Sequence, residues 1–215
     1  MFGPDVIQNS DGTYSLMVGS GDREKPLATY TTAYQVQDDF FVINDNPTSS
    51  TWLSSESSNC SNTSVICLAS LGQLSMTSSG VTGTPTSKGW YLPLAAHESV
   101  VTSALTIYGT ITFSTHIPVP VGGAPTCTST LGTANVYNMN YQNGTSMNGT
   151  SYPFQMIAGG GLPPSPVGGL VTLDNGQQVP FIIGASPNSP LGGGSPPSPT
   201  SSTQPKRRVY WYIQQ

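Results

Sequence analysis

Charged side chains are scarce in this sequence. Only 7% of its 215 residues are Asp, Glu, Lys or Arg, whereas roughly 25% is usual in a soluble domain. Hydroxyl and turn-forming residues take their place, with 24 Gly and 19 Pro in all. The basic residues are too few and too scattered to build the broad positive surface that binds nucleic acid. They are Arg23, Lys25, Lys88, Lys206, Arg207 and Arg208.

Long apolar runs and strong helix formers are also missing. No stretch approaches the roughly 20 apolar residues that span a bilayer, so we expect no membrane span. Low charge with many hydroxyls is typical of exported bacterial proteins. The first residues, Met1 to Pro4, lack the basic segment and apolar core of a signal peptide. We therefore expect either that the start of an exported protein lies upstream or that the chain is cytosolic.

Cysteine is rare, with three in the chain. Cys60 and Cys67 lie seven positions apart in a polar stretch, close enough to close a small disulfide ring. The alternative is two free thiols. If Cys60 and Cys67 form the disulfide, Cys127 has no partner within this chain. It is then either free or paired to a cysteine in sequence outside this chain.

Metal-binding motifs are not evident. The chain has no Cys-x-x-Cys and only two histidines, so we expect no zinc site. Asn9, Asp11 and Gly12 have the spacing of part of a calcium loop, but Ile7 and Val18 occupy its first and last ligand positions. This segment therefore cannot bind calcium in that mode.

Catalytic motifs are missing as well. His97 and Glu98 are adjacent, so on a strand their side chains point to opposite faces, and His116 stands at an expected strand end. No Gly-x-Ser-x-Gly elbow or phosphate-binding loop occurs, and Gly19-Ser20-Gly21 is followed by Glu24 where a dinucleotide loop needs glycine. We expect no catalytic residues, no cofactor and no enzyme activity.

What the sequence does contain is a series of short strands between turns. Asp11-Gly12 between apolar runs predicts a hairpin, and alternation over 101–107 predicts a half-buried strand. Polar loops are expected at 46–64 and 141–166, a flexible Ser/Pro/Gly-rich loop at 185–205, and a short helix at 65–74. The expected strands are 5–8, 13–18, 39–44, 89–94, 99–108, 109–115, 133–140, 170–173 and 179–183. Near the end of the chain, Val209, Trp211 and Ile213 share one face, with two tyrosines on the other.

These elements predict an all-β fold. Consecutive hairpins suit a sandwich or the blades of a β-propeller. Since a blade has four strands, about nine strands make roughly two blades, which cannot close a ring. We therefore expect part of a propeller, an incomplete ring with exposed edge strands.

Several segments resemble one protein family. Taken together and in order, they are similar to the C-terminal β-propeller domain of the PilC/PilY type IV pilus biogenesis and tip-adhesin family. The loops at 46–86 and 141–166 carry no resemblance. The similar segments are 19–27 (GSGDREKPL), 40–47 (FFVINDNP), 89–92 (GWYL), 98–102 (ESVVT), 109–118, 127–137 and 206–212 (KRRVYWY).

The resemblance implies a quinoprotein-like propeller, with residues 1–215 as part of that domain. It implies a role in pilus assembly by opposing retraction, in adhesion and in twitching motility, at the cell surface, pilus tip or outer membrane. The implied partners are minor pilins, the remaining blades, and a host or abiotic surface. Members of the family bind calcium through an Asp-rich loop, but no residues here match it, so no calcium site is carried over.

Two features have alternative roles. The run Asp22-Arg23-Glu24-Lys25 either binds a partner or ties a strand end to its loop, and we favour the structural role. The aromatic residues at strand ends, Trp90, Tyr91, Tyr210 and Trp211, either pack between blades or form a recognition patch, and we favour packing. The repeats Asn143-Gly-Thr-Ser and Asn148-Gly-Thr-Ser have the form of glycosylation sites, but we expect a surface loop.

Other functions fit the same architecture. A quinoprotein-type dehydrogenase shares the propeller fold, and fold does not decide function. Such an enzyme places charged and metal-binding side chains at the propeller centre, and this sequence is poor in both. A structural module of a phage tail or surface passenger is the other alternative, but the sequence has neither trimeric repeats nor a β-helix period.

Overall fold

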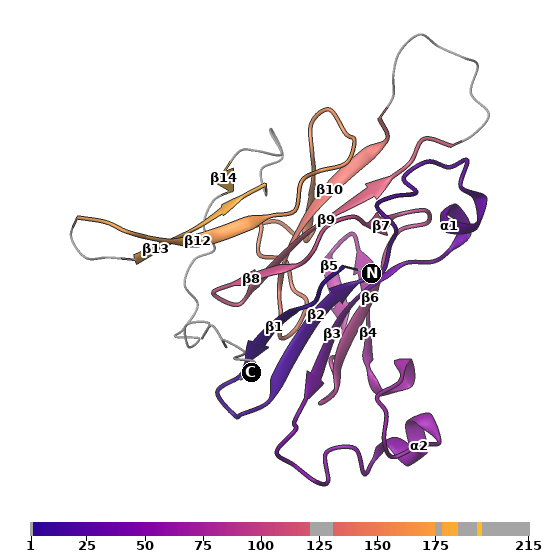
Figure 1. Cartoon of the computed structure of the whole chain (residues 1–215), viewed down its shortest axis with the longest axis vertical. Coiled ribbons are helices and arrows are strands. Elements are labelled where there is room, and N and C mark those ends of the chain that lie inside the picture. Colours follow the sequence, from indigo (N-terminus) through magenta and orange to yellow (C-terminus); the bar gives the residue numbers. More distant parts are fainter. Residues whose placement is uncertain (1, 121–130, 175–177, 185–192, 195–215) are drawn as a thin grey trace, which may run out of the picture.

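The computed structural model describes residues 2–120, 131–174, 178–184 and 193–194. These residues form fourteen strands and three helices of five residues or fewer (Figure 1). The all-β prediction is therefore confirmed. Within the described ranges, no helix is long and apolar enough to cross a membrane.

The first sheet has six strands in the order β1-β2-β3-β6-β4-β5. All its neighbours are antiparallel except β4 and β6. The predicted turn joins β1 to β2: Gly12 has a φ of 86°, and the Asp11 carboxylate accepts hydrogen bonds from the Thr13 N–H and hydroxyl. The strands are β1 (Asp5–Gln8), β2 (Tyr14–Gly19), β3 (Asp39–Asp45), β4 (Gly72–Thr77), β5 (Gly80–Gly83) and β6 (Gly89–Pro93).

The second sheet has the order β11-β10-β9-β7, with β8 also paired to β9. Its centre is the antiparallel pair β9–β10, which stays in register from Thr110 opposite Asn140 to Ile117 opposite Thr133. A tight turn at Tyr108-Gly109, with φ values of 47° and 81°, joins β8 to β9. The strands are β7 (Ser99–Val100), β8 (Leu105–Ile107), β9 (Thr110–Ile117), β10 (Thr133–Asn140) and β11 (Phe154–Met156).

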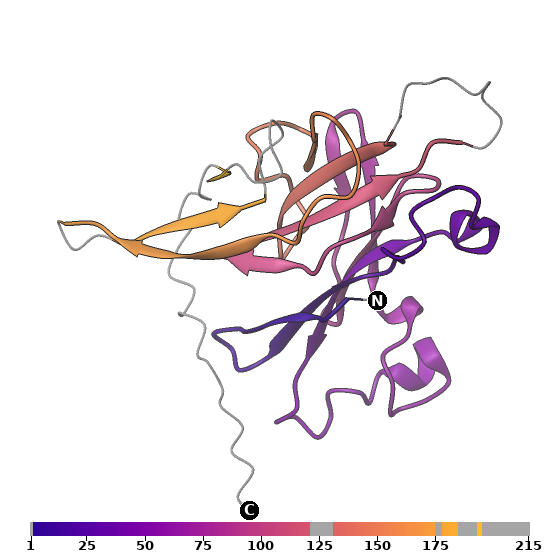
Figure 2. The ribbon, with the colours of Figure 1, turned by 45° about the horizontal axis from the view of Figure 1, so that its top comes forward.

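The third sheet is small and has the order β12-β13-β14. Strands β12 (Val167–Thr172) and β13 (Gln178–Ile183) form the hairpin that the sequence predicts, and β14 (Gly193–Gly194) pairs with the end of β13. Both ribbon views show this hairpin projecting away from the rest of the molecule (Figure 1, Figure 2).

The core lies between the two larger sheets. Phe40 of β3 stacks on Phe113 of β9 with ring centroids 3.8 Å apart and planes 4° from parallel. Phe113 stacks in turn on Tyr137 of β10 at 4.8 Å. Alternate residues of both sheets complete this layer, as expected for two sheets packed face to face. The core residues are Met17, Phe40, Val42, Leu74, Trp90, Leu92, Leu94, Val100, Ile111, Phe113, Tyr137, Met139 and Tyr141.

Several predicted elements are wrong in detail. The helix expected at 65–74 is a single 3-10 turn, Leu68–Ser70, followed by β4, because Gly72 and Leu74 alternate into the core. The strand expected at 99–108 is split into β7 and β8. The polar loop at 46–64 contains the helix α2 (Glu56–Cys60), and the loop at 141–166 contains β11.

The described residues form two packed sheets and a projecting hairpin, without a closed ring of blades. The helix α1 (Thr31–Gln35), which the sequence analysis did not predict, lies in the connection between β2 and β3. The alternating segment 209–213 and most of the loop predicted at 185–205 lie outside the described residues.

The aromatic stack should carry a large part of the stability. We expect Phe113→Ala to lower the free energy of unfolding by about 3–5 kcal/mol, because it removes a fully buried ring and leaves a cavity. The control Tyr30→Ala, at a side chain that is 44% exposed, should change it by no more than about 0.5 kcal/mol. Urea titration measures both. Equal effects would show that the sheets are not held by this stack.

Candidate functional site

The connection between β2 and β3, residues 20–38, forms a lobe at one end of the molecule (Figure 1). We call it the connecting lobe. Three of its apolar side chains are unusually exposed: Leu27 by 57%, Tyr30 by 44% and Val36 by 51%. Its helix α1 buries no residue. Exposed aliphatic and aromatic side chains beside charges are typical of protein-binding surfaces.

Two glycines bring the base of the lobe against β7. A Cβ atom on Gly19 would lie 2.5–2.7 Å from the Val100 side chain, and one on Gly21 would overlap the Val100 backbone. Gly21 also has a φ of 151°. The sequence analysis expected glycine here for close approach, and the backbone of Ser20 accepts a 3.1 Å hydrogen bond from Val100.

Arg23 fastens the lobe to two distant segments. Its guanidinium donates to the carbonyl of Val101 at 2.7 Å and to the carbonyl of Pro163 at 2.6 Å. The contact to Pro163 spans 140 positions in the sequence. These two hydrogen bonds tie the lobe to the end of β7 and to the segment around Pro163.

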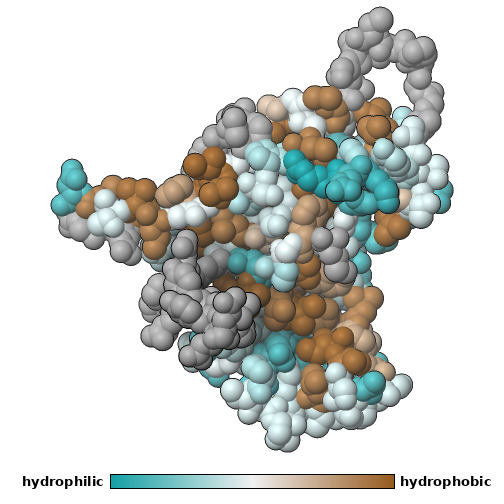
Figure 3. Space-filling view, in the orientation of Figure 1, coloured by the Kyte–Doolittle hydropathy of each residue, from teal (hydrophilic) through white to brown (hydrophobic). Residues whose placement is uncertain are grey.

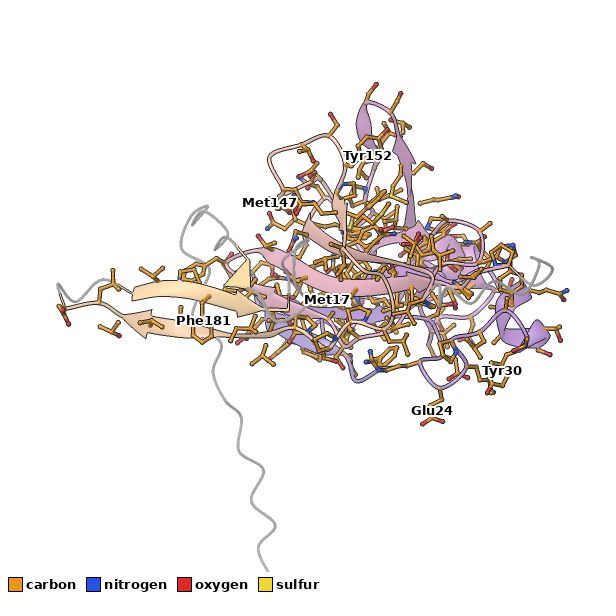
Figure 4. The ribbon with its side chains drawn as sticks, turned by 90° about the horizontal axis from the view of Figure 1, so that it is seen from above. Met17, Glu24, Tyr30, Met147, Tyr152 and Phe181 are labelled. Atoms are coloured by element: carbon orange, nitrogen blue, oxygen red, sulfur yellow. A yellow bond between two sulfur atoms is a disulfide. The ribbon has the colours of Figure 1, made fainter. Side chains whose placement is uncertain are left out.

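The other charges of the run face solvent. Asp22 and Lys25 form an exposed ion pair of 3.3 Å, and the Asp22 carboxylate accepts the Glu24 N–H at 3.1 Å. Partial burial acts to raise the pKa of Asp22, but the hydrogen bonds and the charge of Lys25 outweigh it and lower the pKa. Figure 4 shows Glu24 and Tyr30 on the same side, pointing away from Met17 in the core.

The far end of the lobe is held by a buried carboxylate. Asp38 is 5% exposed and accepts hydrogen bonds from the hydroxyls of Ser20 at 2.7 Å and Ser99 at 2.6 Å. Among the described residues, no hydroxyl donates to the carboxylate of its neighbour Asp39. Burial, together with the nearby charge of Asp38, raises the pKa of Asp39.

Both histidines flank the lobe without forming a catalytic pair. The exposed His97 ring stacks on Tyr34 with centroids 3.8 Å apart, and its Nδ1 lies 2.7 Å from the Tyr34 carbonyl. His116 is buried, with Nε2 2.9 Å from the carbonyl of Leu131. The depression between them and Asp22 has a volume of about 10 Å³, which is room for about one water molecule.

Glu98 is saturated by donors inside the second sheet. It is 2% exposed and accepts hydrogen bonds from the Thr115 hydroxyl, the Asn135 amide at 3.0 Å and the Tyr137 hydroxyl at 3.0 Å, and from the Ala95 N–H at 3.1 Å. Burial and the adjacent Glu98 raise the pKa of Tyr137. Glu98 thus joins β9, β10 and the segment before β7 from a buried position.

A second charged group holds the loop that follows β3. Lys88 pairs with the buried Glu56 at 3.8 Å, donates to the Trp52 carbonyl and lies 3.6 Å from the centre of the Trp52 ring. A hydrogen bond from Ser70 lowers the pKa of Glu56, against the effect of burial. Cys60, which lies close to Glu56, forms a disulfide with Cys67.

The remaining predicted residues are structural or lie elsewhere. Trp90 is buried in the core and donates its Nε1–H to the Tyr141 carbonyl at 2.9 Å. Asn143 accepts the Thr145 N–H and hydroxyl within an exposed turn. Cys127, Tyr210 and Trp211 lie outside the described residues. Within the described ranges, no three His, Cys, Asp or Glu side chains gather as a metal site would need.

A larger depression lies between β10 and the segment after β11. Its volume is about 270 Å³, near the lower limit for small-molecule sites. Its lining has no titratable side chain: Gly132, Thr133, Met156, Ile157, Ala158, Gly159 and Gly160. The connecting lobe is therefore the stronger candidate, and its chemistry fits contact with another surface.

Comparison with solved structures shows a likeness in fold to a known protein. No family model and no curated protein matches the chain. Among solved structures, the C-terminal domain of PilY1 from Pseudomonas aeruginosa is similar, with a TM-score of 0.53 and 11% sequence identity. The match covers 85% of this chain and 43% of that chain, so this chain spans less than half of its length. At such low identity the likeness shows the fold alone.

We expect the members of the charged run to differ sharply in their effect on stability. Arg23→Ala should lower the free energy of unfolding by about 2–3 kcal/mol, because two carbonyls lose a charged donor. Lys25→Ala should cost no more than about 0.5 kcal/mol, because its ion pair is exposed. Denaturant unfolding of both variants measures this. Similar small losses would mean that Arg23 does not anchor the lobe.

Asp39 should make the fold less stable as the pH rises. Folding raises the pKa of Asp39, so the protonated side chain favours the folded state. Its contribution to the free energy of unfolding is fully present below the unfolded pKa of about 3.9. That contribution is lost as the pH rises through the pKa of the folded state. We therefore expect Asp39→Asn to be more stable than the parent at pH 7 and equal to it near pH 3. Thermal melts across this range test it, with Asp174→Asn, at an exposed side chain, as a control. A loss of stability in Asp39→Asn at pH 7 would contradict the assignment.

Proposed function

We propose that this chain is part of a type IV pilus-associated surface protein that acts by binding other proteins or surfaces. The observation that carries the proposal is the fold likeness to the PilY1 C-terminal domain over 85% of the chain. A second support is independent of the structure. Several segments of the sequence resemble the PilC/PilY family and follow one another in the same order as in that family. The proposed roles are pilus assembly against retraction, adhesion and twitching motility.

We also propose that the two larger sheets are neighbouring blades of a propeller whose ring extends beyond residues 1–215. Adjacent blades pack face to face through apolar side chains, as the Phe40–Phe113–Tyr137 stack does here. The implied location is the cell surface, at the pilus tip or outer membrane. Pilus subunits and the remaining blades would be the partners.

Binding, with no catalysis, is the activity that the geometry supports best. The connecting lobe presents Leu27, Tyr30 and Val36 to solvent on a base that is fixed by Arg23 and Asp38. A rigid base lowers the entropy lost on association, and aromatic side chains often dominate binding energy. The depression beside the lobe holds about one water molecule, so a flat partner suits it better than a small substrate.

The test uses source cells that carry the gene with lobe substitutions. We expect Leu27→Ser/Tyr30→Ser to reduce surface piliation and twitching about tenfold or more, because a loss of 1.4 kcal/mol or more in binding has that effect. The matched control is Leu131→Ser/Tyr152→Ser, at side chains that are 58% and 45% exposed, against 57% and 44% in the lobe. Sheared appendages are probed with an antibody to residues 206–215.

Detection in the appendage fraction, with loss of motility only in the lobe variant, would support the proposal. Detection in the cytosol alone would contradict the pilus role. Equal loss in both variants would contradict the lobe as the binding surface. Turnover of an alcohol or aldehyde by the purified chain with added quinone and calcium would contradict the proposal that it is not an enzyme.

A further inference from the structure

The hairpin β12–β13 presents an unusually apolar face. Val167, Val171 and Ile183 lie on one side of it, because Val167 pairs with Ile183 and side chains alternate along a strand. Their exposed fractions are 61%, 48% and 42%. Figure 3 shows brown, hydrophobic atoms along this projection. We call this side the outer face of the hairpin.

One end of the hairpin's opposite side packs on the rest of the molecule. A Cβ on Gly168 would collide with the Ile107 side chain and lie 2.8 Å from that of Leu105, so this side packs on β8. Ile182 is buried there at 2% exposure. Leu170, further along this side, is 48% exposed, so the packing covers only the end at Gly168 and Ile182. The outer face is exposed at both of its ends and is the more apolar surface for a further element to cover.

The edge of the same sheet is open as well. Strand β12 is the first strand in the order β12-β13-β14, so one of its edges has no hydrogen-bonded strand among the described residues. An open edge beside exposed Val167 and Val171 is a template for an added strand. No residue of β12 is charged, so nothing on the strand opposes such pairing.

We propose that residues 206–213 of this chain dock as a strand along the free edge of β12. In the sequence Lys-Arg-Arg-Val-Tyr-Trp-Tyr-Ile, residues 209, 211 and 213 alternate with two tyrosines. An added strand would place Val209, Trp211 and Ile213 on one side. That side would extend the apolar outer face of the hairpin.

Charge favours the same arrangement. All ten acidic residues but only three of the six basic residues lie in the described ranges, and the other three are Lys206, Arg207 and Arg208. An antiparallel strand would start beside the end of β12, close to the exposed Asp174. The basic residues would then lie near that carboxylate, which is favourable at the ionic strength of cells if the distance is short.

The chain is long enough to reach this edge. The segment between β14 and Lys206 is 195–205, which is rich in proline and, at about 3.1 Å per residue, spans up to about 34 Å. Crossing three strand spacings of about 4.8 Å and moving about five residues along β12 needs roughly 22 Å. The connection therefore fits without stretching.

Trypsin tests the proposal on the purified 215-residue chain, since its basic residues are the cleavage sites. We expect cleavage after Lys206, Arg207 and Arg208 to be about tenfold or more slower than in a synthetic peptide of residues 195–215, because docking hides the bonds. Val171→Asp should restore the peptide rate. The control Val65→Asp, at a side chain exposed by 43%, should leave the protection intact.

A second variant, Trp211→Ser, changes the tail side of the proposed contact and alters none of the described residues. It should also restore fast cleavage, while the melting temperature of the sheets stays near that of the parent. The digestion is repeated at several protein concentrations, and light scattering at each one shows whether the chain is a monomer or a dimer. Cleavage of the parent tail at the peptide rate would overturn the proposal. So would protection that appears only with a dimer, since a second copy would then cover the hairpin.

Discussion

The architecture depends on the contact between the inner faces of two sheets. Phe40, Phe113 and Tyr137 come from three strands and stack in one continuous column across the interface. Neither sheet could bury its apolar side chains alone, because a sheet with one hydrophobic face needs a second layer. The connecting lobe, the Glu98 network and the loop after β3 all take their positions from strands that this contact holds in place.

The few charged side chains inside the molecule connect distant segments. Arg23 joins the connecting lobe to the end of β7 and to Pro163. Glu98 gathers donors from three segments, and Glu56 and Lys88 hold the disulfide-closed loop. Since a buried charge is costly unless it is well paired, each of these groups specifies one arrangement of segments. This explains why a chain with so few charges still places several of them inside.

The same economy leaves the exposed apolar surfaces easy to identify. The connecting lobe and the hairpin β12–β13 both expose side chains that an ordinary surface would replace with polar ones. They differ in what surrounds them. The lobe combines Leu27 and Tyr30 with charged neighbours, which suits a reversible partner. The outer face of the hairpin lies beside the uncharged edge of β12, which pairs with no strand among the described residues and suits a permanent strand.

By itself the sequence determined the all-β class, the hairpin at Asp11-Gly12, strand β10 and the hairpin β12–β13, because alternation and turn chemistry act over a few residues. It also singled out the run from Asp22 to Lys25. Only the tertiary structure decided that Arg23 anchors this run, that Leu27 and Tyr30 face solvent, and that Glu56 meets Lys88. These contacts join segments up to 140 positions apart, and local patterns contain no information about which distant segments meet.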